Sequence, residues 1–360
     1  MKETIKLSIL DTEKKYSYEI DEKTYGANQM VQWGADNAAP LLYRNCYRNS
    51  ATLKSIIDGS VNYVLGDNII VNAGAWQKEV NRRGMTMRQF VAHLAMSFLT
   101  YGGYAFQVVY NRLFIPVELF PLDMTKIRTN ESGSKVWFNK KGWAKYSTKA
   151  EEFDAWNPEK IDPEKLTQIF VYKGDFTSNV YPLPPYYGAI ADVLTEVECG
   201  RYSLNSVTNG FMAKYVINFP EANNLTDEQK RGIEDAIKKK YSGSEAEANF
   251  LMYWSEDGDK KIEISKIEGD DTPDRYIAIK DNARQNIFIS MRATPNLFGL
   301  PTATTGFNSQ EYTAAMKLFE RTVIDPIRDG IKESISKVIG VENAIQFVPF
   351  TISFDDSKEE

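Results

Sequence analysis

The stretch from Asp281 to Tyr312, DNARQNIFISMRATPNLFGLPTATTGFNSQEY, decides the architecture expected for this chain. An amphipathic helix ends at Thr294-Pro295, and a new helix opens at Asn308, where Glu311 three residues later suits a helix cap. Between them lies the uncharged loop GLPTATTGFN, which is longer than a helical bundle needs. An ordinary helix connection is one interpretation. A loop that contacts a ligand or partner is the other, because long loops on rigid elements often carry function.

Bulk composition limits the possible classes of protein. The chain has 360 residues, 42% of them hydrophobic, so we expect two or three folded domains. A formal net charge of −6 argues against a general nucleic-acid binder, although a protein can surround DNA without gripping it. Two cysteines without CxxC spacing make a disulfide framework or zinc site unlikely and favour a reducing compartment. We expect neither a signal peptide nor a membrane-spanning helix.

Hydrophobic periodicity predicts an α+β first region. The expected helices cover 41–50, 53–64 and 87–100. The expected strands cover a hairpin at 4–20, then 69–71, 104–110, 113–119, 135–138, 143–146 and 169–172. We place tight turns at Asn111-Arg112 and Gly142, and a helix stop at Tyr101-Gly102-Gly103.

The second half alternates long helices with a small module. A helix is expected over 190–209. A β-α-β-β module follows at 212–272, with strands at 213–219, 249–253 and 261–267, and Thr226 with Gln229 forming a capping box for its helix. Further helices cover 273–292 and 308–338, the latter kinked at Pro326, and a strand covers 344–354.

Charge is distributed unevenly in this half. Residues 220–272 carry 14 acidic and 8 basic side chains, whereas 273–294 carry four basic and two acidic ones. Solvated surfaces are the simpler explanation. The alternative is an acidic protruding module on a weakly basic helical neck.

Enzyme motifs are weak. The single histidine, His93, follows the helix pattern, and we expect it to be a buried or half-buried packing residue. There is no G-x-S-x-G or P-loop motif. The carboxylate pairs Asp257/Asp259 and Asp270/Asp271 suit a turn and a helix start, so we expect no metal, cofactor or catalytic residue.

Four motifs in order then resemble one family. They are YPLPPYYGAIADVLTEVECGRYS, NGFMAKYVINFP with LTDEQKRGIEDAIKKKYSG, ARQNIFISMRATPNLFGL, and NSQEYTAAMKLFERTVIDPI. Together they resemble the HK97-type portal proteins of tailed bacteriophages. The chain departs from the family at Thr294, where a proline is frequent, and at LPPYYG in place of G-x-S-P.

The resemblance implies a domain plan. It gives a wing at 1–185, a first stem helix at 186–211, a clip at 212–272 and a second stem helix at 273–296. A tunnel loop at 297–308, a long helix at 309–340 and a terminal strand and tail at 341–360 complete it.

The resemblance also implies a ring, expected to be a dodecamer, at one capsid vertex of the virion and assembled in the host cytoplasm. Double-stranded DNA would pass through it, and the expected partners are the terminase large subunit, the major capsid protein and head-completion or adaptor proteins. The tunnel-loop residues would be Leu300, Thr302, Thr304, Thr305, Phe307 and Asn308; the basic stem residues Lys280, Arg284 and Arg292; the clip contacts Lys238, Lys239, Lys240, Asp257 and Asp259.

A ring needs a lateral seam, and the apolar stem residues Tyr276, Ile277, Ile287, Phe288 and Met291 are the candidates. Two alternatives stay open. One is a phage nuclease with an acidic site, and the other is a virion structural protein that is not a portal.

Overall fold

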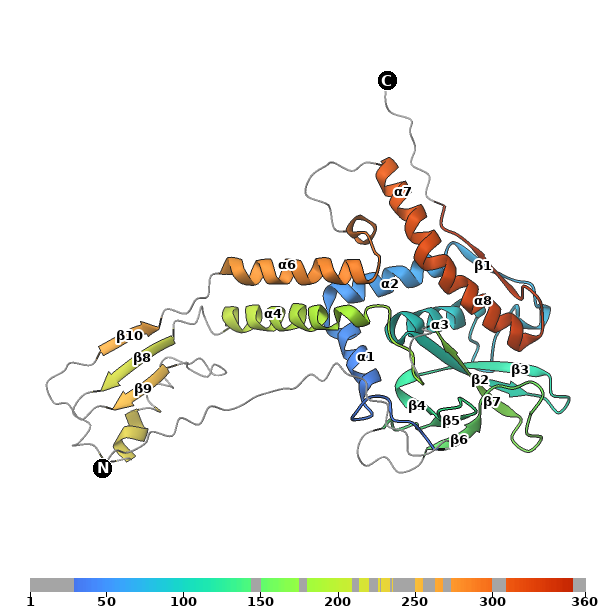
Figure 1. Cartoon of the computed structure of the whole chain (residues 1–360), viewed down its shortest axis with the longest axis horizontal. Coiled ribbons are helices and arrows are strands. Elements are labelled where there is room, and N and C mark those ends of the chain that lie inside the picture. Colours follow the sequence, from blue (N-terminus) through green and yellow to red (C-terminus); the bar gives the residue numbers. More distant parts are fainter. Residues whose placement is uncertain are drawn as a thin grey trace, which may run out of the picture. The chain divides into compact units, whose positions relative to one another are not determined.

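The chain forms two compact units (Figure 1). Unit 1 comprises Met1–Arg48, Ser55–Tyr187 and Thr294–Glu360, and unit 2 comprises Asn49–Lys54 and Gly188–Ala293. The structure, a computed structural model, describes residues 29–143, 150–174, 180–208, 214–219, 226, 228–233, 235, 250–254, 263–267, 273–299 and 309–351. Helices and strands are mixed, which confirms the predicted α+β class. The hairpin predicted at 4–20 lies outside the described residues.

Three helices open the described chain: α1 (Ala39–Asn49), α2 (Ala51–Leu65) and α3 (Met87–Tyr101). All three were predicted. Thr86 and Gln89 cap α3 reciprocally, and Gly102 ends it with φ +81°. A Cβ at Gly102 would lie 1.9 Å from the Leu183 carbonyl oxygen, so only glycine fits there. His93 is exposed, which contradicts the predicted packing role, because its position falls beside the apolar face of α3 and not on it.

The larger sheet of unit 1 is antiparallel and has the order β3-β2-β7. Its strands are β2 (Gly103–Tyr110), β3 (Pro116–Leu122) and β7 (Thr167–Lys173). The turn before β3 is longer than predicted. The Asn111 side chain accepts hydrogen bonds from the N–H groups of Leu113 and Ile115, both at about 3 Å, which holds these residues in the turn and delays β3 until Pro116.

Aromatic pairs across this sheet build the core of unit 1. Tyr104 stacks on Tyr172 with ring centroids 4.7 Å apart, and Phe106 stacks on Phe170 at 4.8 Å. Both pairs are directly opposite one another in the register of β2 and β7. Phe106 also meets Phe90 of α3 edge-on at 5.4 Å. Cross-strand aromatic pairs of this kind fix register as well as burying area.

A smaller antiparallel sheet has the order β4-β5-β6, with β4 (Ile127–Thr129), β5 (Lys135–Phe138) and β6 (Glu151–Asp154). The predicted pairing of 135–138 with 143–146 is wrong, because β4 and β6 occupy both edges of β5. Lys135 forms ion pairs with Glu152 at 3.0 Å and Asp154 at 2.7 Å across the β5–β6 pair. These opposite charges favour the observed partner.

The C-terminal helix is broken at the predicted place. It consists of α7 (Ser309–Phe319), a π-helical turn (Glu320–Ile324) and α8 (Asp325–Ile339). Pro326 has no N–H to donate, and just before it the Asp325 N–H reaches back five residues to the Glu320 carbonyl. After Gly340, β11 (Ile345–Val348) pairs antiparallel with β1 (Asn68–Val71), and it is shorter than the strand predicted at 344–354.

Arg328 on α8 is a buried cation, 4% exposed. Its guanidinium donates to the carbonyls of Tyr63 at 2.5 Å and Val64 at 3.0 Å, at the C-terminal end of α2. It also pairs with Glu320 at 2.7 Å and Asp325 at 3.3 Å. Helix C-termini leave carbonyls without intrahelical donors and favour positive charge. Arg328 therefore fixes α8 against α2.

Unit 2 contains two long helices and a three-stranded sheet. The helices are α4 (Ile190–Thr208) and α6 (Pro273–Ser290), and the strands are β8 (Lys214–Phe219), β9 (Phe250–Trp254) and β10 (Glu263–Ile267). β8 is central, parallel to β9 and antiparallel to β10. A parallel pair needs a crossover, and the intervening chain contains helical residues 228–233. Thr226 and Gln229 form the predicted capping box.

Candidate functional site

The helices α4 and α6 pack on each other within unit 2. Tyr202 stacks on Tyr276 with centroids 4.3 Å apart, and Asn286 donates to the Asp192 carboxylate at 2.8 Å. The two contacts are ten residues apart on each helix and run in opposite directions, so the pair is antiparallel. Ten helical residues span about 15 Å, so the two contacts hold the helix pair together at two well-separated points.

One stripe of α6 is open to solvent. Its residues recur at helical spacing of four and three: Ala278, Asn282, Gln285, Ile289 and then Arg292 just beyond the helix. The opposite stripe, Ala283, Ile287 and Met291, is buried. The open stripe contains no carboxylate and one arginine, so it is a polar surface of low charge.

The structure changes the predicted seam. Ile287, Phe288 and Met291 are buried within the chain, so they are not free to contact a neighbouring molecule. Ile277 is 58% exposed, as a seam residue should be, and Ile289, which the prediction missed, is 72% exposed. On α4, Leu204 is 64% exposed. These exposed aliphatic side chains make the α4–α6 pair the candidate interaction surface of unit 2.

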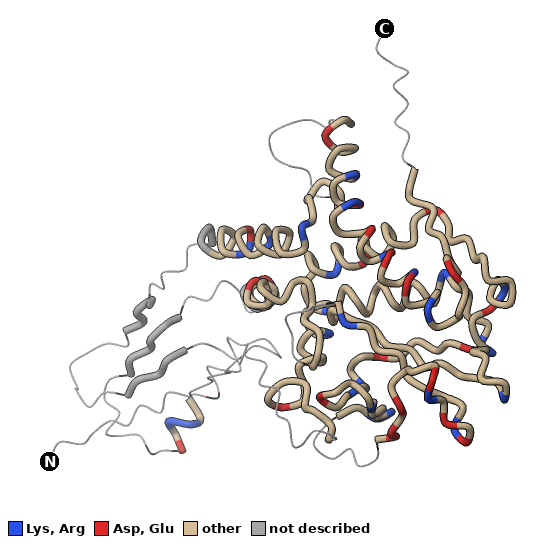
Figure 2. Tube along the Cα trace, turned by 45° about the vertical axis from the view of Figure 1, so that its right-hand side comes forward, with Lys and Arg blue, Asp and Glu red and all other residues tan. Residues whose placement is uncertain are grey.

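The three predicted basic stem residues differ in environment. Arg284 is partly exposed and forms an ion pair with Asp281 at 3.3 Å on the same helix, so its charge is partly balanced. Lys280 is partly exposed, and Arg292 is exposed with φ +51°. Figure 2 shows basic and acidic residues interspersed along the described trace. Their combined field is therefore weaker than the sequence count suggests.

The uncharged loop is held at its base. Before it, the short 3-10 helix η5 (Pro295–Phe298) ends at Gly299, and Phe298 meets Tyr63 and Phe319 edge-on at 6.2 and 5.7 Å. A Cβ on Gly59 would lie 2.7 Å from the Phe298 ring, so the ring lies close against α2. After the loop, α7 ends at Phe319, so the two elements that flank the loop in sequence, η5 and α7, meet in one aromatic cluster.

Sequence reasoning missed one buried acid in unit 2. Glu196 of α4, 6% exposed, accepts hydrogen bonds from the Ser50 hydroxyl, from the Thr52 hydroxyl at 2.6 Å and from the Thr52 N–H at 3.3 Å. Ser50 Oγ in turn accepts from the Leu53 N–H at 3.0 Å. The first N–H groups of α2 need acceptors, and negative charge is favoured there.

Some predicted residues lie outside the described residues. They are the loop residues Leu300, Thr302, Thr304, Thr305, Phe307 and Asn308 and the clip residues Lys238, Lys239, Lys240, Asp257 and Asp259. Among the residues that the structure describes, no group of three or more His, Cys, Asp or Glu side chains is placed to hold a metal ion. Within the same residues, no helix has the length and apolar character needed to cross a membrane.

Unit 2 thus contains an antiparallel helix pair with exposed aliphatic residues and a small strand module, and η5 and α7 of unit 1 flank the uncharged loop in sequence. The family model described as phage portal protein matches residues 77–359. The chain therefore belongs to the phage portal protein family, which confirms the resemblance and the portal function expected from it.

Solved structures agree at the level of fold. A chain in the virion of a native gene transfer agent particle is similar, with TM-score 0.58, 16% identity, and coverage of 90% of this chain and 86% of that chain. A chain in the neck of a native gene transfer agent particle, computed with C12 symmetry, has TM-score 0.56 and 15% identity, and the match covers 90% of this chain and 86% of that chain. An HK97-family phage portal protein from Corynebacterium diphtheriae has TM-score 0.52 and 11% identity, and the match covers 82% of this chain and 90% of that chain. A search of curated proteins finds no match.

Proposed function

We propose that this portal-family chain works as a closed homo-oligomeric ring of about twelve copies at one vertex of a virion. The observation that carries the proposal is the set of exposed aliphatic residues on the α4–α6 pair, Leu204, Ile277 and Ile289. Membership of the portal family and the C12 symmetry of a structurally similar neck support it.

The loop at 297–308 and Arg292 just before it are proposed to face double-stranded DNA. A conduit must pass a polyanion without holding it, and every cation that neutralises a phosphate deepens binding. The loop is uncharged, and the Arg284 charge is partly balanced by Asp281. Twelve copies of Arg292 would still form one basic belt, which keeps the duplex centred.

The remaining partners follow from the same assignment. We assign the clip at 212–272 as the surface for the terminase large subunit during packaging and for head-completion or adaptor proteins afterwards. Its net charge of −5, together with the basic run Lys238–Lys240, offers both signs for such contacts. Unit 1 is assigned to the side that meets the major capsid protein, and assembly is placed in the host cytoplasm.

Ring assembly is tested by adding charge to the open aliphatic positions. The double variant Ile277→Glu/Ile289→Glu should shift mass photometry from a ring to monomers or small oligomers, because burying two carboxylates without partners is costly. The control Ser55→Glu/Asn62→Glu adds the same two carboxylates at exposed positions of α2 in unit 1 and should retain the ring. A wild-type mass near that of one chain would refute the proposal.

The channel and the nuclease alternative are separated by two further measurements. Electron microscopy down the ring axis should show a central hole wide enough for a duplex. Incubation with linear DNA and Mg²⁺ should leave the DNA intact, whereas cleavage lost in Asp257→Asn would favour the nuclease.

A further inference from the structure

Unit 1 contains a groove of about 620 Å³ between α1, α3 and the end of β3. Its apolar lining includes Met85, Leu94, Met96, Phe120 and Leu122. Sites of this size with an apolar lining and a few polar groups are typical of ligand and peptide sites. Nothing in the ring function proposed above uses this groove.

Three arginines, Arg44, Arg48 and Arg83, line the groove. Among the described residues, no carboxylate lies within ion-pair distance of Arg44, Arg48 or Arg83. The Nε of Arg44 is buried and has no hydrogen-bond partner in the described chain. A buried donor without an acceptor is costly, and its presence points to an absent anionic ligand.

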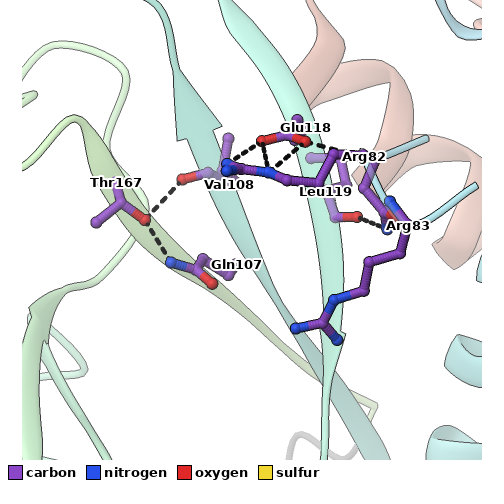
Figure 3. Close-up of polar contacts among 8 residues, drawn as sticks. Arg82, Arg83, Gln107, Val108, Glu118, Leu119 and Thr167 are labelled. Atoms are coloured by element: carbon purple, nitrogen blue, oxygen red, sulfur yellow. Dashed lines mark hydrogen bonds and ion pairs between the residues drawn. The ribbon is translucent and has the colours of Figure 1, made fainter. Parts of the chain in front are cut away.

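Two neighbouring arginines, Arg82 and Arg83, differ in their ion pairing (Figure 3). Arg82 is bound in bidentate fashion by Glu118, with contacts of 2.5 to 3.1 Å. The adjacent Arg83 turns its guanidinium away from that pair in the same view. The central carbon of that guanidinium lies 5.3 Å from the centroid of the Phe120 ring. One carboxylate, Asp123, also lines the groove, but it accepts from the Thr125 N–H and hydroxyl at 2.9 and 2.7 Å.

An acidic peptide with an aromatic or aliphatic anchor fits these features. Its carboxylates would pair with the arginines, and its apolar side chain would contact the methionines and Phe120. This chain contains such a segment, FDDSKEE at 354–360, with four carboxylates against one lysine. We propose that residues 354–360 of one copy dock in this groove of another copy of the ring.

The docked segment comes from a different copy, because the chain before it ends far from the groove of its own copy. The Thr351 N–H donates to the Asp67 side chain at 3.2 Å, and Arg88 of α3 donates to the Gly66 carbonyl next to Asp67 at 3.0 Å. Ser97 of α3, which lines the groove, lies nine residues after Arg88. At 3.6 residues per turn this is about 180° around the helix. The segment thus starts on the far side of α3 from its own groove.

The test places a photocrosslinker in the full chain. Phe354 is replaced by p-benzoylphenylalanine, and unlabelled and ¹⁵N-labelled copies are mixed before assembly. The proposal rests on the ring, so ring mass is measured separately on the same sample. Irradiation should join position 354 to peptides of α1, α3 or β3, and mixed-isotope pairs should show that two copies are joined.

Charge-removed variants make the test decisive. Arg44→Gln/Arg48→Gln/Arg83→Gln should lower the crosslink yield at least about fivefold, as expected for three partly exposed charge pairs. The control Arg82→Gln, which removes a paired neighbour, should leave the yield unchanged. Intact rings that crosslink elsewhere, within one copy, or equally in the triple variant would overturn the proposal and leave the ring function standing.

Discussion

Arg328→Met tests whether one buried cation holds the broken C-terminal helix in place. The substitution keeps an unbranched side chain of similar reach and removes the guanidinium. The carbonyls of Tyr63 and Val64 then lose their charged donor, and the carboxylates of Glu320 and Asp325 lose a cation.

The magnitude follows from burial. Each hydrogen bond from a charged donor contributes about 1.5–3 kcal/mol, and the two carbonyl bonds lie in the interior. The carboxylates contribute less, because Glu320 and Asp325 keep 20% and 33% of their side-chain surface exposed and can be hydrated. We therefore expect a loss of about 3–5 kcal/mol of unfolding free energy, in line with the removal of one partner from a buried pair.

The assay is urea unfolding followed by tryptophan fluorescence at one protein concentration, since assembly adds to apparent stability. Arg321→Met is the matched control: this arginine precedes Arg328 by two helical turns, contacts the same Asp325 at 3.7 Å and is 85% exposed. It should cost less than about 0.5 kcal/mol. Equal losses in the two variants, or a loss below about 1 kcal/mol in Arg328→Met, would refute the reasoning.

Three further predictions concern other parts of the chain. Glu196→Gln should cost about 1–3 kcal/mol and speed hydrogen exchange at Thr52 and Leu53, whereas Glu198→Gln, whose pair with Arg201 is exposed, should change neither. Gly330→Ala should lower the melting temperature, because its Cβ would lie 2.8 Å from the Tyr172 hydroxyl of a stacked pair; Gly200→Ala, whose Cβ meets no atom within 4 Å, should not. The hydrogen bond from Arg82 lowers the pKa of Glu118, so this pair stabilises the fold above the ordinary glutamate pKa of about 4.3 and the contribution is lost as pH falls through the lowered value. The free energy of unfolding, measured from about pH 6 to about pH 2, should fall less steeply in Glu118→Gln than in the wild type.

Local patterns carried most of the fold. The glycine at 102 predicted the end of α3, and the proline at 326 predicted the break in the last helix, because these signals act within a few residues. Strand pairing could not be read in the same way. The partners of β5 depend on the distant charges Glu152 and Asp154, and the parallel pairing of β8 with β9 depends on a crossover.

The site was predicted less well because it depends on which side of each helix is covered. Ile287 and Ile289 have the same chemistry and stand two residues apart, yet one is fully buried and the other is 72% exposed. Periodicity gives the apolar positions of a helix but not its rotation against α4. Likewise, Glu196 resembles any helical glutamate until the fold brings it to the start of α2.

The exposed isoleucines of α6 also show what a ring would require. Ile277, Ile279 and Ile289 are 58%, 41% and 72% exposed, and full burial of an isoleucine side chain contributes about 1.5–3 kcal/mol. In a closed ring each copy meets two neighbours, so covering all three would contribute about 3–5 kcal/mol per copy, at the low end of the roughly 4–15 kcal/mol that association costs. Contacts of α6 alone are too weak to close a ring, so other surfaces must add to them.

The exposed turn before β3, with Leu113 76% and Ile115 53% exposed, is the described apolar patch of unit 1 best able to contribute. Polar substitution there should weaken assembly along with substitution on α6, and a ring insensitive to the turn would restrict the missing energy to the clip or the docked 354–360 segment.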